Sequence, residues 1–192
     1  LDTDIRYCKG IGEKKAQLFN KLGVINVHDL VSYFPRKYED RSSFKPIALT
    51  CDGETVCINA LAAEDARLVR IRRGLELVKF RVVDESGSVD ITFFNQPYIK
   101  NNIHRGDSLN IYGKIIGVGG KRTMTNPVIE REGTVGGVTG RIVPVYRLTT
   151  GLSQKLVMSA VRQALDASAA DLPEVLPESL RKKYRLAQTG YA

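Results

Sequence analysis

The clearest pattern in this chain of 192 residues is the alternation of apolar and polar positions in V-D-I-T-F-F-N-Q-P-Y, residues 89–98. A period of two predicts a half-buried strand. If Phe93 faces the core with the other apolar positions, Phe94 lies on the opposite, polar face. Tyr98 follows four residues later, after a turn that contains Pro97. The pattern therefore predicts a pair of aromatic side chains, Phe94 and Tyr98, presented on the surface.

Two interpretations of this pair are open on the pattern alone. A second Phe at the end of a strand is often covered by the helix or loop that follows, and a nearby Tyr can close a core. On a basic, β-rich protein, a presented aromatic pair is instead a platform on which nucleobases stack. The surroundings of the pair decide between packing and stacking.

Together with this segment, other alternating segments predict a set of five or so short antiparallel strands in the same part of the chain. They are expected at 56–62, in a strand that ends near 72, and at 78–83, 89–94, 109–115 and 121–125. Turns are expected at Arg72-Arg73-Gly74, Asp84–Gly87 and Gly119-Gly120. Such strands suit a small closed barrel, and residues 97–104 stand where an OB-fold carries its helix or loop. A sandwich is the alternative on pattern alone.

The first 50 residues are expected to be helical. A tight glycine turn at K-G-I-G, residues 9–12, leads into a helix that Gly23 is placed to end. A second helix is expected to start near Asn26, with Asp29 as its capping partner, and to stop by Pro35. The arrangement resembles a helix-hairpin-helix, whose turn amides can hold a phosphate. A packed helical support for the next domain is the alternative.

The last part of the chain is expected to be helical again. Ser153 can cap a helix with one apolar stripe, which is most simply a packing face. The stripe consists of Val157, Ala160, Val161, Ala164 and Leu165. Pro173 and Pro177 end this helix, and a short basic helix follows over Glu178–Tyr184. The expected domains are a helical segment at 1–50, a β-rich segment at 51–149 and a helical segment at 150–192.

The charge distribution favours a polyanionic partner. The chain has 29 Lys and Arg against 21 Asp and Glu, a formal charge of +8. Between positions 67 and 81 only Glu76 opposes a cluster of basic residues. The cluster consists of Arg67, Arg70, Arg72, Arg73, Lys79 and Arg81. A charge run is usually a solvated face, but this one flanks a predicted hairpin beside the aromatic strand. A second basic group lies at residues 181–185.

Several classes of chemistry are not represented in the sequence. No apolar run approaches the ~20 residues of a membrane span, and no signal-peptide segment is present. Cys8, Cys51 and Cys57 form no CxxC motif, so we expect no structural zinc and a reducing compartment. The stretch 117–123 lacks the first glycine of a phosphate-binding loop, because position 115 is Ile. With no carboxylate pair or nucleophile arrangement either, the chain is expected to hold no catalytic centre and no cofactor.

Several blocks of the sequence together resemble one known family. They are K-G-I-G-E-K-K-A (9–16), L-G-V (22–24), D-L-V-S-Y-F-P-R-K-Y-E-D-R (29–41), F-F-N-Q-P-Y (93–98), P-V-Y-R-L-T-T-G-L-S-Q-K (144–155) and L-P-E-S-L (176–180). In this combination, and over almost the whole chain, they resemble the N-terminal wedge region of the ATP-dependent DNA helicase RecG. The ends of the chain are expected to be cuts in a longer protein, and it stops about where the family's motor would begin.

The resemblance implies an OB-fold flanked by helices that docks on branched DNA. A motor outside this chain, with ATP and Mg²⁺, would pull duplex arms past it to remodel stalled replication forks and Holliday junctions in recombination and repair. It also implies a bacterial, cytoplasmic, nucleoid-associated protein with no membrane partner. The tail of a single-stranded-DNA-binding protein is a further candidate partner.

The same resemblance assigns roles to the candidate site residues. The family's wedge stacks an aromatic pair on bases at the branch point, and this role carries over to Phe94 and Tyr98. The six basic residues at 67–81 carry over only as a general phosphate-contacting surface. From the residues alone, two alternatives stay open: an interaction module that binds an acidic protein tail, and a general binder of single-stranded DNA.

Overall fold

The computed structural model describes residues 2–117, 121–168 and 172–189. The chain divides into two compact units, which consist of residues 1–38 with 144–192 and of residues 39–143. We call them the helical unit and the barrel unit. Each has its own hydrophobic core. β1 (Lys37–Asp40) and β9 (Ile142–Val145) form a two-stranded sheet apart from the barrel strands.

The compact units divide the chain at 38/39 and 143/144, whereas the sequence pattern placed the divisions at 50/51 and 149/150. Residues 39–50 go with the barrel because Ile47 is fully buried in the barrel core and the Lys45 amide donates to the Cys57 carbonyl at 2.9 Å. Residues 144–149 go with the helices because Tyr146 is buried there and stacks on Tyr33, with ring centroids 5.9 Å apart.

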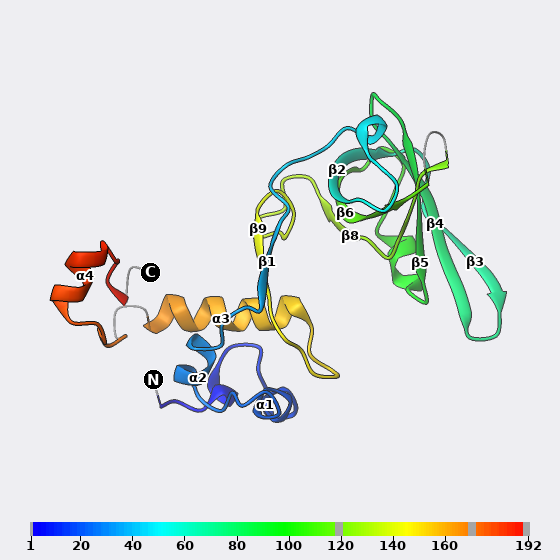
Figure 1. Cartoon of the computed structure of the whole chain (residues 1–192). Coiled ribbons are helices and arrows are strands. Elements are labelled where there is room, and N and C mark those ends of the chain that lie inside the picture. The colour runs from blue at the N-terminus through cyan, green and yellow to red at the C-terminus, as the bar shows by residue number, and fades with distance from the viewer. Residues whose placement is uncertain (1, 118–120, 169–171, 190–192) are drawn as a thin grey trace. The chain divides into compact units, whose positions relative to one another are not determined.

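The barrel unit contains a seven-stranded sheet. Its strands are β2 (Thr55–Ala62), β3 (Arg67–Arg72), β4 (Leu75–Val83), β5 (Ser88–Phe94), β6 (Ser108–Ile116), β7 (Thr123–Thr125) and β8 (Val128–Arg131). Pairings run from β2 to β4, β5, β7 and β6, and β6 pairs with β2 again. This circuit confirms the expected OB-fold-like architecture. β3 and the adjoining half of β4 project from it as a hairpin (Figure 1).

One pairing differs from the expected antiparallel pattern. β5 and β7 are parallel, with Asp90 opposite Thr123 and Thr92 opposite Thr125. Parallel neighbours need a long crossover connection, and here the chain between them contains the short helix η3 (Pro97–Asn101) and β6. The predicted turn at Gly119-Gly120 lies outside the described residues.

The barrel core is built by the inward-facing positions of the strands, because alternate side chains of a strand point to opposite faces. The side chains that the core buries completely include Ile58, Val78, Ile91, Leu109, Ile111, Ile115 and Met124. In β2 the alternation at 56–62 predicts every second side chain inward, and Val56, Ile58, Ala60 and Ala62 are all buried. Cys57, on the other face of that strand, is buried as well.

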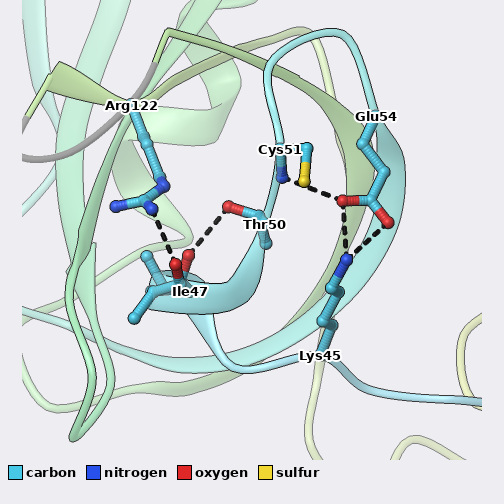
Figure 2. A network of polar contacts seen from close by, with 7 residues as sticks. Lys45, Ile47, Thr50, Cys51, Glu54 and Arg122 are labelled. Atoms are coloured by element: carbon cyan, nitrogen blue, oxygen red, sulfur yellow. Dashed lines mark hydrogen bonds and ion pairs between the residues drawn. The ribbon is translucent and has the colours of Figure 1, made fainter.

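The segment that contains the short helix η2 (Ile47–Leu49) packs against the barrel core. Ile47 enters the core, and its Cγ2 would lie 3.0 Å from a Cβ added at Gly87, which leaves little room for a side chain there. The segment is stabilised by its own polar contacts (Figure 2). Lys45 Nζ lies 2.8 Å from both carboxylate oxygens of Glu54, which also accepts the Cys51 amide at 2.9 Å. The Thr50 hydroxyl donates to the Ile47 carbonyl at 2.8 Å.

Asp84 connects this segment to the β4–β5 turn. Its carboxylate accepts the backbone N–H groups of Ile47 at 2.8 Å, Ser86 at 2.7 Å and Gly87 at 2.8 Å. Burial by itself raises the pKa of Asp84, but the hydrogen bonds from Ile47, Ser86 and Gly87 outweigh it and hold the pKa below its usual value.

The helical unit confirms the elements expected from capping signals. Its helices are η1 (Ile5–Tyr7), α1 (Glu13–Asn20), α2 (Val27–Val31), α3 (Gln154–Ser168) and α4 (Glu178–Tyr184). Asn26 and Asp29 form a capping box at α2, and Ser153 Oγ accepts the Leu156 amide at 3.3 Å. Gly23, at φ +79°, follows α1. In the part of the chain that the structure describes, no helix combines the length and apolar character needed to cross a membrane.

Replacing Asp84 with Ala is expected to lower the free energy of unfolding by about 1–3 kcal/mol at pH 7, because three N–H groups lose a charged acceptor. The folded-state pKa is lowered, so this stabilisation is present above the ordinary carboxyl range. It is lost as the pH falls through the lowered pKa, below about pH 4. Urea denaturation of parent and variant at several pH values measures it. Asp84→Asn, which does not titrate, is the control, and a parent–variant difference independent of pH would contradict the prediction.

Candidate nucleic-acid interface

The register of β5 places its two neighbouring phenylalanines on opposite faces. Phe93 is 4 % exposed and stacks on Phe80 in the core, with ring centroids 6.5 Å apart. Phe94 is 42 % exposed on the outer face. The alternation predicted this arrangement, and the structure confirms it: the core takes Phe93 and leaves Phe94 at the surface.

The strands beside β5 carry basic residues onto the same outer face. Residues opposite each other in neighbouring strands share a face. Phe94 lies opposite Leu77, which lies opposite Val69, so the aromatic ring belongs to an apolar row. The next row along the strands pairs Arg67 with Lys79. Two cations thus stand directly opposite one another in the row next to the one that holds Phe94.

Half of the predicted basic cluster is already paired with carboxylates. Arg67 lies 2.9 Å from Glu64, Arg70 lies 2.9 Å from Glu76, and Arg81 lies 2.7 Å from Asp90. The hydrogen bond that Arg81 donates to Asp90, together with the negative charge of Asp90, raises the pKa of Arg81 above its usual value. These arginines are mostly exposed, so each ion pair contributes little to stability. Their charge is nevertheless largely compensated.

The remaining cations of the cluster are Arg72, Arg73 and Lys79. Within the described residues, no carboxylate lies at ion-pair distance from any of them. Arg72 and Arg73 stand at the tip of the projecting hairpin, where Gly74 adopts φ +80° to make the turn. A register shift between Arg70 and Arg72 marks an irregularity just before the tip.

A hollow of about 570 Å³ connects the hairpin tip with the turn that follows Phe94. Arg72 and Arg73 line it from the hairpin, and Asn95 and Pro97 line it from the other side. Arg72 and Arg73, two of the cations without a carboxylate partner among the described residues, therefore lie close to the segment that joins Phe94 and Tyr98. Tyr98, in η3, is 62 % exposed, and its hydroxyl donates to Gln96 Oε1 at 2.7 Å.

The other basic candidates of the sequence belong to the helical unit. Lys15 Nζ donates to the Gly10 carbonyl at 2.9 Å, which ties this lysine to the glycine turn before α1. In and near α4, Arg181 lies 3.4 Å from Glu174, and Lys182 lies 2.8 Å from Glu178. The turn and α4 thus use part of their charge in local contacts.

No metal site is evident in the described residues, because no group of three or more His, Cys, Asp or Glu is placed to hold an ion. Cys8, Cys51 and Cys57 are free thiols. Burial raises the pKa of the Cys57 thiol, which makes it less reactive.

Sequence reasoning missed three amide side chains around the aromatic pair. Asn126 Oδ1 accepts the backbone N–H of Phe94 at 2.9 Å, although the two residues are 32 positions apart. Asn95 Oδ1 accepts the backbone N–H of Glu76 at 3.0 Å, and Gln96 accepts the Tyr98 hydroxyl. The F-N-Q-P-Y block contained Asn95 and Gln96, but nothing in the local pattern indicated Asn126.

The fold and this surface define a class: an OB-fold module, flanked by helices, with an exposed aromatic residue and with cations that have no carboxylate partner among the described residues. A family model described as the RecG wedge domain matches residues 4–167. The chain belongs to the RecG wedge family.

Known relatives agree over most of the chain. It is 31 % identical over 187 residues to the ATP-dependent DNA helicase RecG of Streptococcus pneumoniae, covering 97 % of this chain and 27 % of the relative. RecG of Thermotoga maritima is 28 % identical, with 97 % and 24 % covered. A solved RecG bound to a three-way DNA junction superposes with a TM-score of 0.83 at 28 % identity, covering 98 % of this chain and 26 % of that one. The chain spans about a quarter of the length of these relatives.

Proposed function

We propose that this chain is the branched-DNA-binding wedge of an ATP-dependent DNA helicase. The observation that carries the proposal is the exposed Phe94 on a face whose neighbouring cations, Arg72, Arg73 and Lys79, have no carboxylate partner among the described residues. Membership of the wedge family supports it, as does the likeness to a RecG that was solved on a three-way junction.

The wedge acts passively at the branch point. Parting the terminal base pair of an arm exposes base faces, and stacking on Phe94 and Tyr98 recovers about 1–3 kcal/mol for each base. Because every base has a π-face, this contribution does not depend on sequence. Selectivity then comes from the shape of the junction, since nothing in the proposed contacts reads base edges.

The cations at the hairpin supply affinity that depends on salt. Arg72, Arg73 and Lys79, for which the described part of the chain offers no carboxylate partner, can contact phosphates, and each contact releases condensed counterions from the DNA. The paired arginines Arg67, Arg70 and Arg81 contribute less, because a phosphate competes with the carboxylate that each already holds.

We extend the proposal to the whole protein of which this chain is a part. A motor elsewhere in that protein binds ATP and Mg²⁺ and draws duplex arms past the wedge, remodelling stalled replication forks and Holliday junctions during recombination and repair. Its place is the bacterial cytoplasm, at the nucleoid, and the tail of a single-stranded-DNA-binding protein is a second partner.

An interaction module for acidic protein tails is the second candidate, because the same uncompensated cations suit carboxylates. General single-strand binding is the third. Affinities for a three-way junction, a single strand, a linear duplex and an acidic peptide, measured at one salt concentration, separate them. The wedge function requires the junction to bind more tightly than the other three.

Binding to a three-way junction is expected to weaken steeply with salt, with a log–log slope of about −3 to −4 if about four phosphates are contacted. Replacing Arg72 and Arg73 with Ala should flatten the slope by about one to two units. Fluorescence anisotropy across a salt series measures it. The control is Glu64→Gln with Arg67→Gln, which removes an ion pair without changing net charge and should leave the slope almost unchanged. Equal slopes for the parent and the Arg72/Arg73 variant would contradict the role of the tip.

Phe94→Ala is expected to reduce junction affinity by about 1–3 kcal/mol, the range for one stacked base, while barely changing stability. Phe93→Ala should lower stability by about 3–5 kcal/mol, because it truncates a buried Phe. The two neighbours differ only in the face of β5 they occupy, so each is the control for the other. Melting temperature and junction affinity are measured for both. Unchanged affinity of Phe94→Ala would remove this residue from the interface.

This chain by itself is expected to release no phosphate from ATP, with or without DNA, because its sequence contains no phosphate-binding loop. A coupled assay on a preparation freed of contaminating ATPase measures the release. The control is the chain with Phe94→Ala, which should give the same background. DNA-stimulated release that co-purifies with the parent chain would contradict the assignment of ATP chemistry to a separate motor.

A further inference from the structure

We propose that Asn126 is a positioning residue for the aromatic pair, acting on Phe94 directly and on Tyr98 through Gln96. The inference rests on the proposed function of the pair and names the groups that hold it in place. It assigns a role to two amide side chains that neither the barrel core nor the basic hairpin requires.

Asn126 continues the hydrogen bonding of β5 beyond the end of its pairing with β7. That pairing ends at Thr92 and Thr125. The Asn126 amide then donates to the Thr92 carbonyl at 2.9 Å, and Asn126 Oδ1 accepts the Phe94 amide at 2.9 Å. The side chain thus supplies the acceptor that a longer β7 would have supplied. Asn126 has φ +46°, a left-handed conformation that Asn tolerates better than most residues.

Gln96 links Asn126 to Tyr98, the second aromatic residue of the pair. Gln96 Nε2 lies 3.5 Å from the same Asn126 Oδ1, at the outer limit of a hydrogen bond. Gln96 Oε1 accepts the Tyr98 hydroxyl at 2.7 Å. Asn126, Gln96 and Tyr98 therefore form a continuous series of contacts that begins at the backbone of Phe94.

The opposite edge of β5 is held by a second asparagine. The Asn95 amide donates to the Glu76 carbonyl at 2.8 Å, and Asn95 Oδ1 accepts the Glu76 amide at 3.0 Å. Asn95 also has a left-handed conformation, at φ +53°. The chain around Phe94 is thereby fixed on both sides before it turns into η3, and this turn sets the position of Tyr98.

A fixed pair binds better than a mobile one, because ordering a side chain upon binding opposes association. The contacts themselves are exposed to water, so their loss should hardly affect stability. Asn126 is therefore expected to influence the affinity for branched DNA far more than the folding of the barrel.

The test is Asn126→Gly, which retains access to the left-handed backbone conformation and removes only the side chain. Affinity is measured with a three-way junction that carries 2-aminopurine at the branch point, so that its fluorescence reports stacking. We expect about two- to tenfold weaker binding and a smaller stacking signal. The melting temperature and the salt slope should stay close to those of the parent. Asn59→Ala, which removes another exposed side-chain amide contact of the barrel, is the matched control and should change none of these.

Tyr98→Phe tests the Gln96 connection with no change of ring. The hydroxyl contact is lost while the stacking surface remains, so we expect a loss of affinity in the same direction as for Asn126→Gly and no change in melting temperature. Binding of Tyr98→Phe equal to that of the parent would overturn the part of the proposal that reaches Tyr98.

A variant that lacks the rings of Phe94 and Tyr98 tests whether Asn126 affects affinity through these two rings. Combined with Phe94→Ala and Tyr98→Ala, Asn126→Gly should cause no further loss. An undiminished further loss overturns the proposal. The proposal is also overturned if Asn126→Gly binds the junction as tightly as the parent while Phe94→Ala binds it weakly. In that case the proposed wedge function is retained. Parent-like binding of Phe94→Ala would instead refute the role of the pair, and the positioning role with it.

Discussion

The structure of this surface depends on the pairing of β5 along both of its edges, with β4 on one side and β7 on the other. Pairing on two sides fixes the pleat of the strand, so that Val89, Ile91 and Phe93 all point into the core. A slip of one residue would exchange the two faces completely. The exposure of Phe94 is therefore maintained by the same contacts that stabilise the barrel.

The distribution of counter-charges then divides the basic surface into two kinds of cation. Arg81 and Asp90 face each other across β4 and β5, and Arg70 and Glu76 do so across β3 and β4. Such pairs keep the surface polar, but because each charge is compensated by its partner, it is less available to a ligand. At the tip, Arg72 and Arg73 have no such partner among the described residues, and they line the hollow next to Asn95. A junction would meet free charge beside exposed aromatic surface.

Much of the local structure could be predicted from short stretches of sequence. The alternation at 89–94 gave the faces of β5, Gly74 marked the hairpin turn, and Asn26 with Asp29 marked the start of α2. Each of these signals acts between residues that are close in the chain. The resemblance carried by several such blocks added the family, which the matching model over residues 4–167 confirmed.

Periodicity, turn residues and capping pairs are local, so the sequence by itself determined which elements form and which face of each is apolar. Tertiary structure alone decided which distant elements meet, because that choice depends on closing the barrel. It made β5 and β7 parallel and placed Ile47 in the barrel core. It also brought the Asn126 side chain to the backbone of Phe94. Such contacts join residues that are far apart in the chain. Periodicity, turns and caps involve only residues that are close in the chain, so these local patterns do not indicate which distant residues will meet.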